Sequence, residues 1–158
     1  MAKKRGFGIL EIMISAAILS IVLFSLFSVF AAANKLNLLS SDKIRANFLA
    51  EEGLEAVRYL RDDGWTRNIA PLNSATDYYV SFNTSTLQWS IGATNPGQID
   101  GVFGRVITAG AVYRDSNDDI TASGGTLDPD TLKITSTVTW SASNTLSVET
   151  YLTDLFAN

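Results

Sequence analysis

One carboxylate near the start of this 158-residue chain is unusual because of its surroundings. Glu11 directly precedes a run of 22 residues, from Ile12 to Ala33, that contains no charged side chain. A carboxylate placed at the centre of a membrane helix costs about 2–3 kcal/mol or more on insertion scales, so one near the start of such a helix needs a reason. The chemistry that Glu11 can supply is an ion pair, and the sequence must then provide a cation for it.

The uncharged run is long enough to cross a membrane. As a helix its 22 residues span roughly 33 Å, which covers the hydrocarbon core of a bilayer. Three basic residues precede it, namely Lys3, Lys4 and Arg5. The Lys/Arg bias of cytoplasmic segments therefore predicts a cytoplasmic N-terminus and places everything after Asn34 on the other side of the membrane.

Two ordinary interpretations leave Glu11 unexplained. A secretory signal peptide has an apolar region of about 7–15 residues that ends at a small-x-small cleavage site. Ala31-Ala32-Ala33 offers such a site, but the run before it is too long for a signal peptide. An uncleaved signal anchor accounts for the length and the basic residues, yet it gives no role to Glu11.

The segment KKRGFGILE resembles the type III signal of type IV prepilins and type II secretion pseudopilins. In that family a short basic leader ends in Gly, a peptidase cuts after it, and Glu is the fifth residue of the product. The matching residues are Lys3, Lys4 and Arg5 in the leader, Gly6 before the cut, Phe7 as the new N-terminus, and Glu11. The resemblance further implies that the peptidase N-methylates Phe7.

A cut after Gly6 would give Glu11 a counter-ion. It would release an α-amino group with an ordinary pKa of about 7.7–8, largely protonated at neutral pH. Two unit charges about 4 Å apart attract by roughly 4 kcal/mol at an effective dielectric constant of about 20, comparable with the insertion cost of the carboxylate. In pilin-like filaments the partner is the amine of the adjoining subunit, so the resemblance implies that Glu11 sets axial register during assembly.

Helical periodicity continues beyond the uncharged run. Small and apolar residues recur at steps of three and four as far as Leu60, and Asp63-Gly64 indicates the stop, with Gly64 as a left-handed cap. The sequence predicts one helix from about Phe7 to Asp63. The segment from Ser20 to Ser28 lacks the Gly and Pro that many major pilins carry there, which predicts an unbroken helix and favours a minor pilin or a pseudopilin. The predicted inward positions are Ala46, Ala50, Gly53, Val57 and Leu60.

After Pro71 the hydrophobic period changes to two, which is typical of strands. We expect a hairpin around Asn83 to Thr86, a further strand from Gly101 to Tyr113, and antiparallel pairing between residues 132–140 and 146–152. Ser136 is the one polar residue on the inward face of the strand at 132–140. The predicted fold class is α+β, with a long N-terminal helix packed on a C-terminal antiparallel β-sheet.

These elements predict four segments along the chain. They are a basic leader (1–6), a transmembrane or filament-core helix (7–34), the amphipathic half of the same helix (35–63) and a β-rich globular head (64–158).

A metal site is only weakly indicated. Asp115, Asn117 and Asp119 have the first spacings of a calcium loop, but Ile120 and Thr126 replace the Gly and Glu that such a loop requires. An acidic turn between strands explains the cluster better. Some type II pseudopilins use loop carboxylates for Ca²⁺, so the resemblance keeps the site open as an alternative, with Asp128 and Asp130 as further donors.

Other functions find less support in the composition. The chain has no Cys and no His, and no serine lies in a nucleophile-elbow context, so we predict no enzyme. Without the leader cations, nine basic residues face 16 acidic ones, a balance of −7 that disfavours nucleic-acid binding. Trp65, Trp89 and Trp140 could form a sugar-binding platform, but their spacing indicates packing in or around a core.

The sequence thus predicts a minor pilin or pseudopilin, processed by prepilin peptidase and assembled through its N-terminal helix into a type IV pilus or type II secretion-like filament. Its expected partners are other pilin or pseudopilin subunits, the peptidase, an inner-membrane assembly platform and the membrane, and no cofactor is expected. It would lie in the cytoplasmic membrane and then in a periplasmic or extracellular filament. The alternative is an uncleaved single-pass surface protein with a ligand-binding or adhesive β domain.

Overall fold

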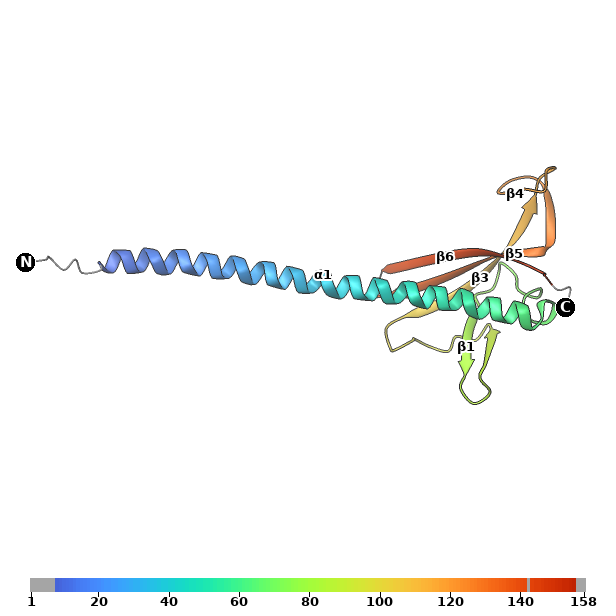
Figure 1. Cartoon of the computed structure of the whole chain (residues 1–158), viewed down its shortest axis with the longest axis horizontal. Helices are drawn as coiled ribbons and strands as arrows, with labels where there is room; N and C mark the ends of the chain where they lie inside the picture. Colours follow the sequence, from blue (N-terminus) through green and yellow to red (C-terminus); the bar gives the residue numbers. More distant parts are fainter. Residues whose placement is uncertain (1–7, 142, 156–158) are drawn as a thin grey trace, which may run out of the picture. The chain divides into compact units, whose positions relative to one another are not determined.

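The computed structural model describes residues 8–141 and 143–155. These residues form the helices α1 (Ile9–Asp63) and α2 (Trp65–Asn68), followed by strands β1 to β6 (Figure 1). The chain divides into two compact units, Met1–Ser41 and Asp42–Asn158, and α1 contributes residues to both. The predicted α+β class, with a long N-terminal helix and an antiparallel sheet, is confirmed.

The first part of α1 is continuous through the uncharged run, as the lack of Gly and Pro between Ser20 and Ser28 predicts. Ser20, Ser25 and Ser28 each donate their hydroxyl hydrogen to the carbonyl oxygen four residues earlier, at 2.7–2.9 Å. These bonds satisfy the hydroxyl groups without breaking the helix. By length and composition α1 can cross a membrane, and none of its most apolar 18-residue window is buried.

The second part of α1 buries one face, as predicted. All five predicted inward positions are buried, and so are Leu54 and Ala56, which lie beside them. The small residues Ala46, Ala50 and Gly53 allow the sheet to approach the helix backbone closely, and the larger residues Val57 and Leu60 fill the space further along.

The predicted left-handed cap at the end of α1 is wrong. Gly64 has φ 160° and ψ 107°, which is extended backbone. The Leu60 carbonyl accepts hydrogen bonds from the Gly64 N–H at 3.2 Å and from the Asn68 side-chain amide at 2.9 Å. Trp65, at 4% exposure, turns into the core immediately afterwards. A side-chain cap and a buried aromatic residue therefore end the helix where a glycine cap was expected.

Strands β1 (Tyr79–Asn83) and β2 (Gln88–Gly92) form a separate antiparallel hairpin, which confirms the turn predicted after Asn83. The Asn83 side-chain carbonyl accepts hydrogen bonds from the backbone N–H groups of Ser85 and Thr86, which shapes this turn. An isolated bridge between Tyr78 and Ile107 connects the start of the hairpin to β3.

The main sheet has four antiparallel strands in the order β4-β3-β5-β6. Its strands are β3 (Gly104–Arg114), β4 (Ile120–Thr121), β5 (Thr126–Trp140) and β6 (Asn144–Thr153). The predicted pairing of the last two strands is confirmed, with Leu132 opposite Leu152. The strand β5 begins earlier than predicted, at Thr126, and the extra length passes a register shift between Ala111 and Val112 of β3.

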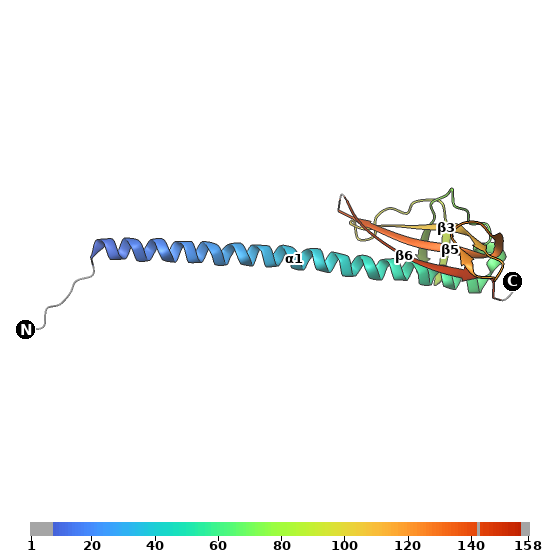
Figure 2. The same ribbon diagram turned by 90° about the horizontal axis from the view of Figure 1, so that it is seen from above.

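The core lies between the second part of α1 and the inner face of this sheet. In Figures 1 and 2 the strands β3, β5 and β6 extend alongside the C-terminal part of the helix. One cluster joins Leu54, Val57 and Leu60 to residues of β3, β5 and β6, and a second joins Ala46 and Ala50 to Phe103, Val138 and Trp140. Burial of these side chains at about 25 cal/mol per Å² of apolar surface holds the helix on the sheet.

Candidate functional site

Glu11 lies in the first turn of α1, where an acidic side chain interacts favourably with the helix dipole. The carbonyl of Gly8 accepts hydrogen bonds from the backbone N–H groups of Glu11 and Ile12, at 3.0 and 3.2 Å. The residue is exposed, and its carboxylate forms no ion pair with any of the residues that the structure describes.

The predicted processing residues lie outside the described part of the chain. These are the leader cations Lys3, Lys4 and Arg5 and the junction between Gly6 and Phe7. Their placement relative to Glu11 and their roles therefore stay predictions.

Large apolar side chains along α1 are more exposed than is usual for a single protein chain in water. Phe24 is 75% exposed, and Phe27 and Phe30 are 69% and 64% exposed. The exposure continues past the uncharged run to Leu36, Leu39, Ile44 and Phe48. An apolar surface of this length is stable only when lipid or other protein covers it. The first half of α1 is therefore a candidate membrane and assembly segment.

Arg105 of β3 connects the second half of α1 to the sheet through hydrogen bonds and an ion pair. Its guanidinium group donates hydrogen bonds to the Leu49 carbonyl at 3.0 Å and to the Glu52 carboxylate at 2.6 Å, and its side chain is 7% exposed. A buried cation needs such partners, because losing one leaves an uncompensated charge. Sequence reasoning missed this contact because both partners lie more than 50 residues away along the chain.

A second attachment joins α1 to the loop before β3. Arg45 forms an ion pair with Asp100, and its guanidinium carbon lies 5.5 Å from the centre of the Phe103 ring. Cation–π contacts of this geometry contribute about 0.5–1 kcal/mol at exposed sites. The two arginines thus connect α1 to β3 and to the loop that precedes it.

The closest approach between helix and sheet is at Gly53. A Cβ atom added there would lie 2.6 Å from the Oγ of Ser136, which is closer than non-bonded atoms tolerate. Ser136 is the inward polar residue expected from the sequence, and it is fully buried. Among the described residues its hydroxyl group has no hydrogen-bond partner. Glycine at position 53 is therefore required by packing on this face of the helix.

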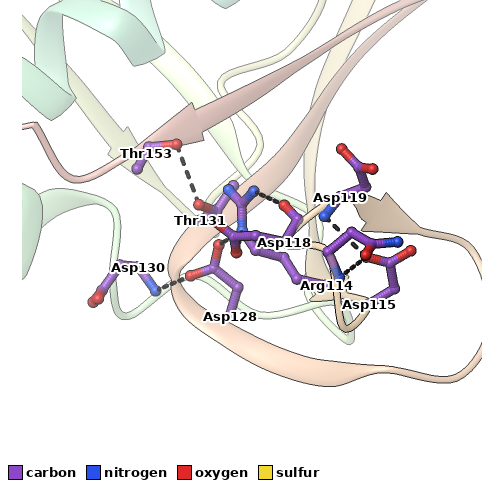
Figure 3. A network of polar contacts seen from close by, with 9 residues as sticks. Arg114, Asp115, Asp118, Asp119, Asp128, Asp130, Thr131 and Thr153 are labelled. Atoms are coloured by element: carbon purple, nitrogen blue, oxygen red, sulfur yellow. Dashed lines mark hydrogen bonds and ion pairs between the residues drawn. The ribbon is translucent and has the colours of Figure 1, made fainter.

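The acidic loop forms a turn stabilised by its own side chains (Figure 3). The Asp115 carboxylate accepts hydrogen bonds from the backbone N–H groups of Asn117 and Asp119, at 2.8 and 3.1 Å. Within residues 8–141 and 143–155 no group of three carboxylates is placed so that it could hold a metal ion. The expected turn is confirmed, and the weak Ca²⁺ prediction for Asp115, Asn117 and Asp119 stays untested.

Arg114 ties this turn to the following strand. Its Nε donates a hydrogen bond to Asp128 at 2.6 Å, and a terminal nitrogen donates to the Asp118 carbonyl at 2.8 Å. The contact with Arg114 is the main cause that lowers the pKa of Asp128, and the Asp130 backbone N–H adds a bond at 3.0 Å. Asp128 is thus engaged by a cation of the chain itself. The predicted further donor Asp130 contributes its backbone here (Figure 3).

The three tryptophans belong to the packing of the head. Trp65 and Trp140 are 4% and 6% exposed, and Trp89 is half-buried against the core. Trp89 also contacts Phe82, with ring centres 5.2 Å apart. These positions confirm the packing role that their spacing predicts.

A comparison with protein families identifies the start of the chain. Residues 1–32 match the family model described as the prokaryotic N-terminal methylation motif, which is the signal of type IV pilins and pseudopilins. The match covers the leader, Glu11 and most of the uncharged run, and it confirms the resemblance seen in KKRGFGILE. No curated protein and no solved structure gives a significant match to the chain.

Proposed function

We propose that this chain is a structural subunit, a minor pilin or pseudopilin, of a type IV pilus or type II secretion-like filament. The observation that carries the proposal is the methylation motif at residues 1–32, which opens a helix whose apolar surface is exposed. A motif of this kind supports a type IV pilin-like protein in general. The assignment to a minor subunit or pseudopilin is our inference from the unbroken helix between Ser20 and Ser28.

The proposed maturation begins in the cytoplasmic membrane. Prepilin peptidase, the expected partner at this stage, removes residues 1–6 and methylates the amine of Phe7. Before the cut, the leader cations hold the N-terminus on the cytoplasmic side, and the uncharged run spans the bilayer. The head, residues 64–158, then lies outside, in line with the predicted segments.

The proposed assembly step uses the charge that processing creates. The new ammonium group of Phe7 needs an anion in apolar surroundings, and Glu11 of the adjoining copy supplies one. The attraction of roughly 4 kcal/mol between the two charges offsets the cost of placing the carboxylate in the membrane. The exposed side chains between Ile12 and Phe48 provide adhesion between helices, and the ion pair provides register. An inner-membrane assembly platform would extract the subunit into the filament.

The proposed function is tested at the N-terminus of the mature protein. Mass spectrometry of the chain from sheared surface fibres or from isolated membranes should find N-methylated Phe7 as the first residue. The variant Gly6→Ala should keep residues 1–6 attached, because the peptidase recognises the Gly before the cut. An intact N-terminus at Met1, or a cut near Ala33, would overturn the proposal in favour of an uncleaved anchor or a secreted protein.

A further inference from the structure

The sequence contains two Asp-Gly dipeptides, Asp63-Gly64 and Asp100-Gly101, and no Asn-Gly dipeptide. An Asp-Gly dipeptide is chemically special because the glycine has no Cβ atom to keep its backbone nitrogen away from the preceding carboxyl group. The first dipeptide lies at the end of α1, and the second lies in the loop before β3. Their surroundings decide whether either of them can react.

The Gly64 nitrogen is held at the end of the helix. Its N–H donates hydrogen bonds to the Leu60 and Arg61 carbonyls, each at 3.2 Å, and Gly64 itself is buried. The Asp63 carboxylate accepts a hydrogen bond from Arg67 at 2.5 Å. The nitrogen and the carboxylate are thus both engaged, so this dipeptide can react only after the end of α1 opens.

The Gly101 nitrogen is free by comparison. Among residues 8–141 and 143–155 no group accepts a hydrogen bond from its N–H. Gly101 is exposed, a Cβ atom added to it would meet no atom within 4 Å, and a surface cavity of about 440 Å³ adjoins it. Water therefore reaches this dipeptide, and no packed side chain shields the nitrogen.

Asp100 and Gly101 occupy the two central positions of a tight turn. The Val102 N–H donates a hydrogen bond to the Ile99 carbonyl at 3.1 Å, and φ is 52° at Asp100 and 69° at Gly101. Positive φ at both central positions is the mark of a type I′ turn, which Asp-Gly favours. The backbone hydrogen bonds of the turn are all local, between Ile99, Val102 and Phe103, so it can open while the rest of the head stays folded.

One contact with α1 restrains the Asp100 side chain. Its carboxylate forms an ion pair with Arg45, whose guanidinium carbon lies 5.5 Å from the centre of the Phe103 ring. The side chain must give up this ion pair before its Cγ atom can close on the Gly101 nitrogen. Both side chains of the ion pair are 54% exposed, and exposed ion pairs are weak, so the restraint slows the reaction without preventing it.

We infer that Asp100 is a site of spontaneous modification, which converts it to isoaspartate at a rate that Arg45 limits. The Gly101 nitrogen attacks the Asp100 Cγ atom, the N–H proton and a carboxyl hydroxyl group leave as water, and a five-membered succinimide ring forms. Water then opens the ring. Cleavage between the nitrogen and Cγ restores aspartate, whereas cleavage between the nitrogen and the main-chain carbonyl carbon gives isoaspartate, with no net change in mass.

The product no longer fits the attachment of this loop to α1. Isoaspartate routes the main chain through Cβ and Cγ, which lengthens it by one carbon atom, and it leaves the carboxylate directly on Cα. Both the turn and the position of the charge opposite Arg45 therefore change. The modification weakens one of the two arginine attachments between α1 and the head as the molecule ages. The inference goes beyond the proposed function and does not depend on it.

Ageing of the full chain in detergent at neutral pH tests the inference. Mass spectrometry with electron-transfer fragmentation distinguishes isoaspartate from aspartate at each position. We expect isoaspartate to form at least about tenfold faster at position 100 than at position 63, because position 63 requires local opening of the helix. In urea, where both dipeptides are unfolded, the two rates should be similar. Equal rates in the folded chain, or no isoaspartate at position 100, would overturn the inference.

Substitutions of the two arginines test the restraint. Arg45→Gln should raise the rate at position 100 by about threefold, as the loss of an exposed ion pair predicts, and Arg45→Lys should match the unmodified chain. Position 63 reports on folding in the same samples, because it stays slow as long as the Gly64 N–H is bonded in the helix. For the same reason Arg67→Gln should leave position 63 slow. An unchanged rate at position 100 in Arg45→Gln would contradict the role of Arg45.

A matched variant tests the consequence for stability. Asp100→Glu keeps the carboxylate, but its longer side chain cannot form the five-membered ring. Ageing should therefore lower the urea midpoint of the unmodified chain and leave that of Asp100→Glu unchanged. An equal loss of stability in both aged proteins would show that the attachment of the loop to α1 does not depend on this modification, and would overturn that part of the inference.

Discussion

Gly53 of α1 and Ser136 of β5 face each other so closely that no side chain fits between them. A Cβ atom at position 53 would lie 2.6 Å from the Ser136 Oγ, 3.0 Å from the Arg105 Cδ and 3.2 Å from the Ile107 Cδ1. The serine hydroxyl is buried and has no hydrogen-bond partner among the described residues. The contact therefore combines a close backbone approach with an unsatisfied polar group. Substitutions at positions 53 and 136 can measure how each of these two features affects the stability of the head.

Gly53→Ala should destabilise the head by about 1–2 kcal/mol, because the overpacking cost of about 1–3 kcal/mol exceeds the gain in helix propensity of up to about 1 kcal/mol. Ser136→Ala should be neutral or stabilising, since it removes a buried group that lacks a partner. The double variant should recover part of the loss. Urea unfolding of the full chain in detergent, followed by tryptophan fluorescence, measures this; strictly additive effects would show that the two residues do not interact.

Glu11→Gln should leave membrane insertion intact and lower incorporation into fibres by at least about tenfold. The side chain keeps its shape, but the loss of the charge removes most of the attraction to the Phe7 ammonium group, which is worth roughly 4 kcal/mol. Fractionation into membranes and sheared fibres, with immunoblotting, provides the measurement. The control is Asp77→Asn, which removes an exposed carboxylate of the head. Normal incorporation of the Glu11 variant would contradict the charge-pair account.

Asp128→Asn should make the stability of the head less dependent on pH in the acidic range. The hydrogen bond from Arg114 lowers the pKa of Asp128 in the folded state. The ionised carboxylate therefore contributes its full stabilisation above the pKa of an unfolded Asp, about 3.9, and this stabilisation is lost as the pH falls through the lower pKa of the folded state. The variant should lose about 1–2 kcal/mol of stability at pH 7 and show a smaller further loss between pH 5 and pH 2. Urea unfolding across this pH range tests it, and an unchanged acid dependence would refute the assignment.

Calcium should not raise the thermal midpoint of the full chain in detergent. Ca²⁺ prefers six to eight oxygen ligands, and the Asp115 carboxylate is already used by two backbone N–H groups, while Asp128 is paired with Arg114. Differential scanning fluorimetry with Ca²⁺ and with Mg²⁺ at equal ionic strength gives the comparison. A rise specific to Ca²⁺ that disappears in Asp115→Asn would establish the site that the loop spacing weakly predicts.

The residue pattern of a short segment was sufficient to predict the features that depend on a single helix or on neighbouring strands. The absence of Gly and Pro predicted a continuous α1, and the steps of three and four identified its buried face from Ala46 to Leu60. The alternation of apolar and polar residues predicted the hairpin after Asn83 and the pairing of the last two strands. The methylation motif was visible because its chemistry depends on a short contiguous segment.

The features that sequence reasoning missed depend on residues far apart in the chain. The contact of Arg105 with Leu49 and Glu52 spans more than 50 positions, so no local pattern predicts it. The end of α1 was misassigned because Asp-Gly suggested a glycine cap, whereas burial of Trp65 and the amide of Asn68 decide the geometry. The short strand β4 exists only through its pairing with the end of β3.

The two arginine attachments have a mechanical consequence. Arg105 connects β3 to α1 near Leu49, and Arg45 connects the preceding loop to α1 some four residues earlier, while the strands extend alongside the helix (Figure 2). A tensile force directed along α1 would therefore shear several parallel contacts simultaneously instead of peeling them apart one after another. Such an arrangement resists extraction of the helix from its sheet.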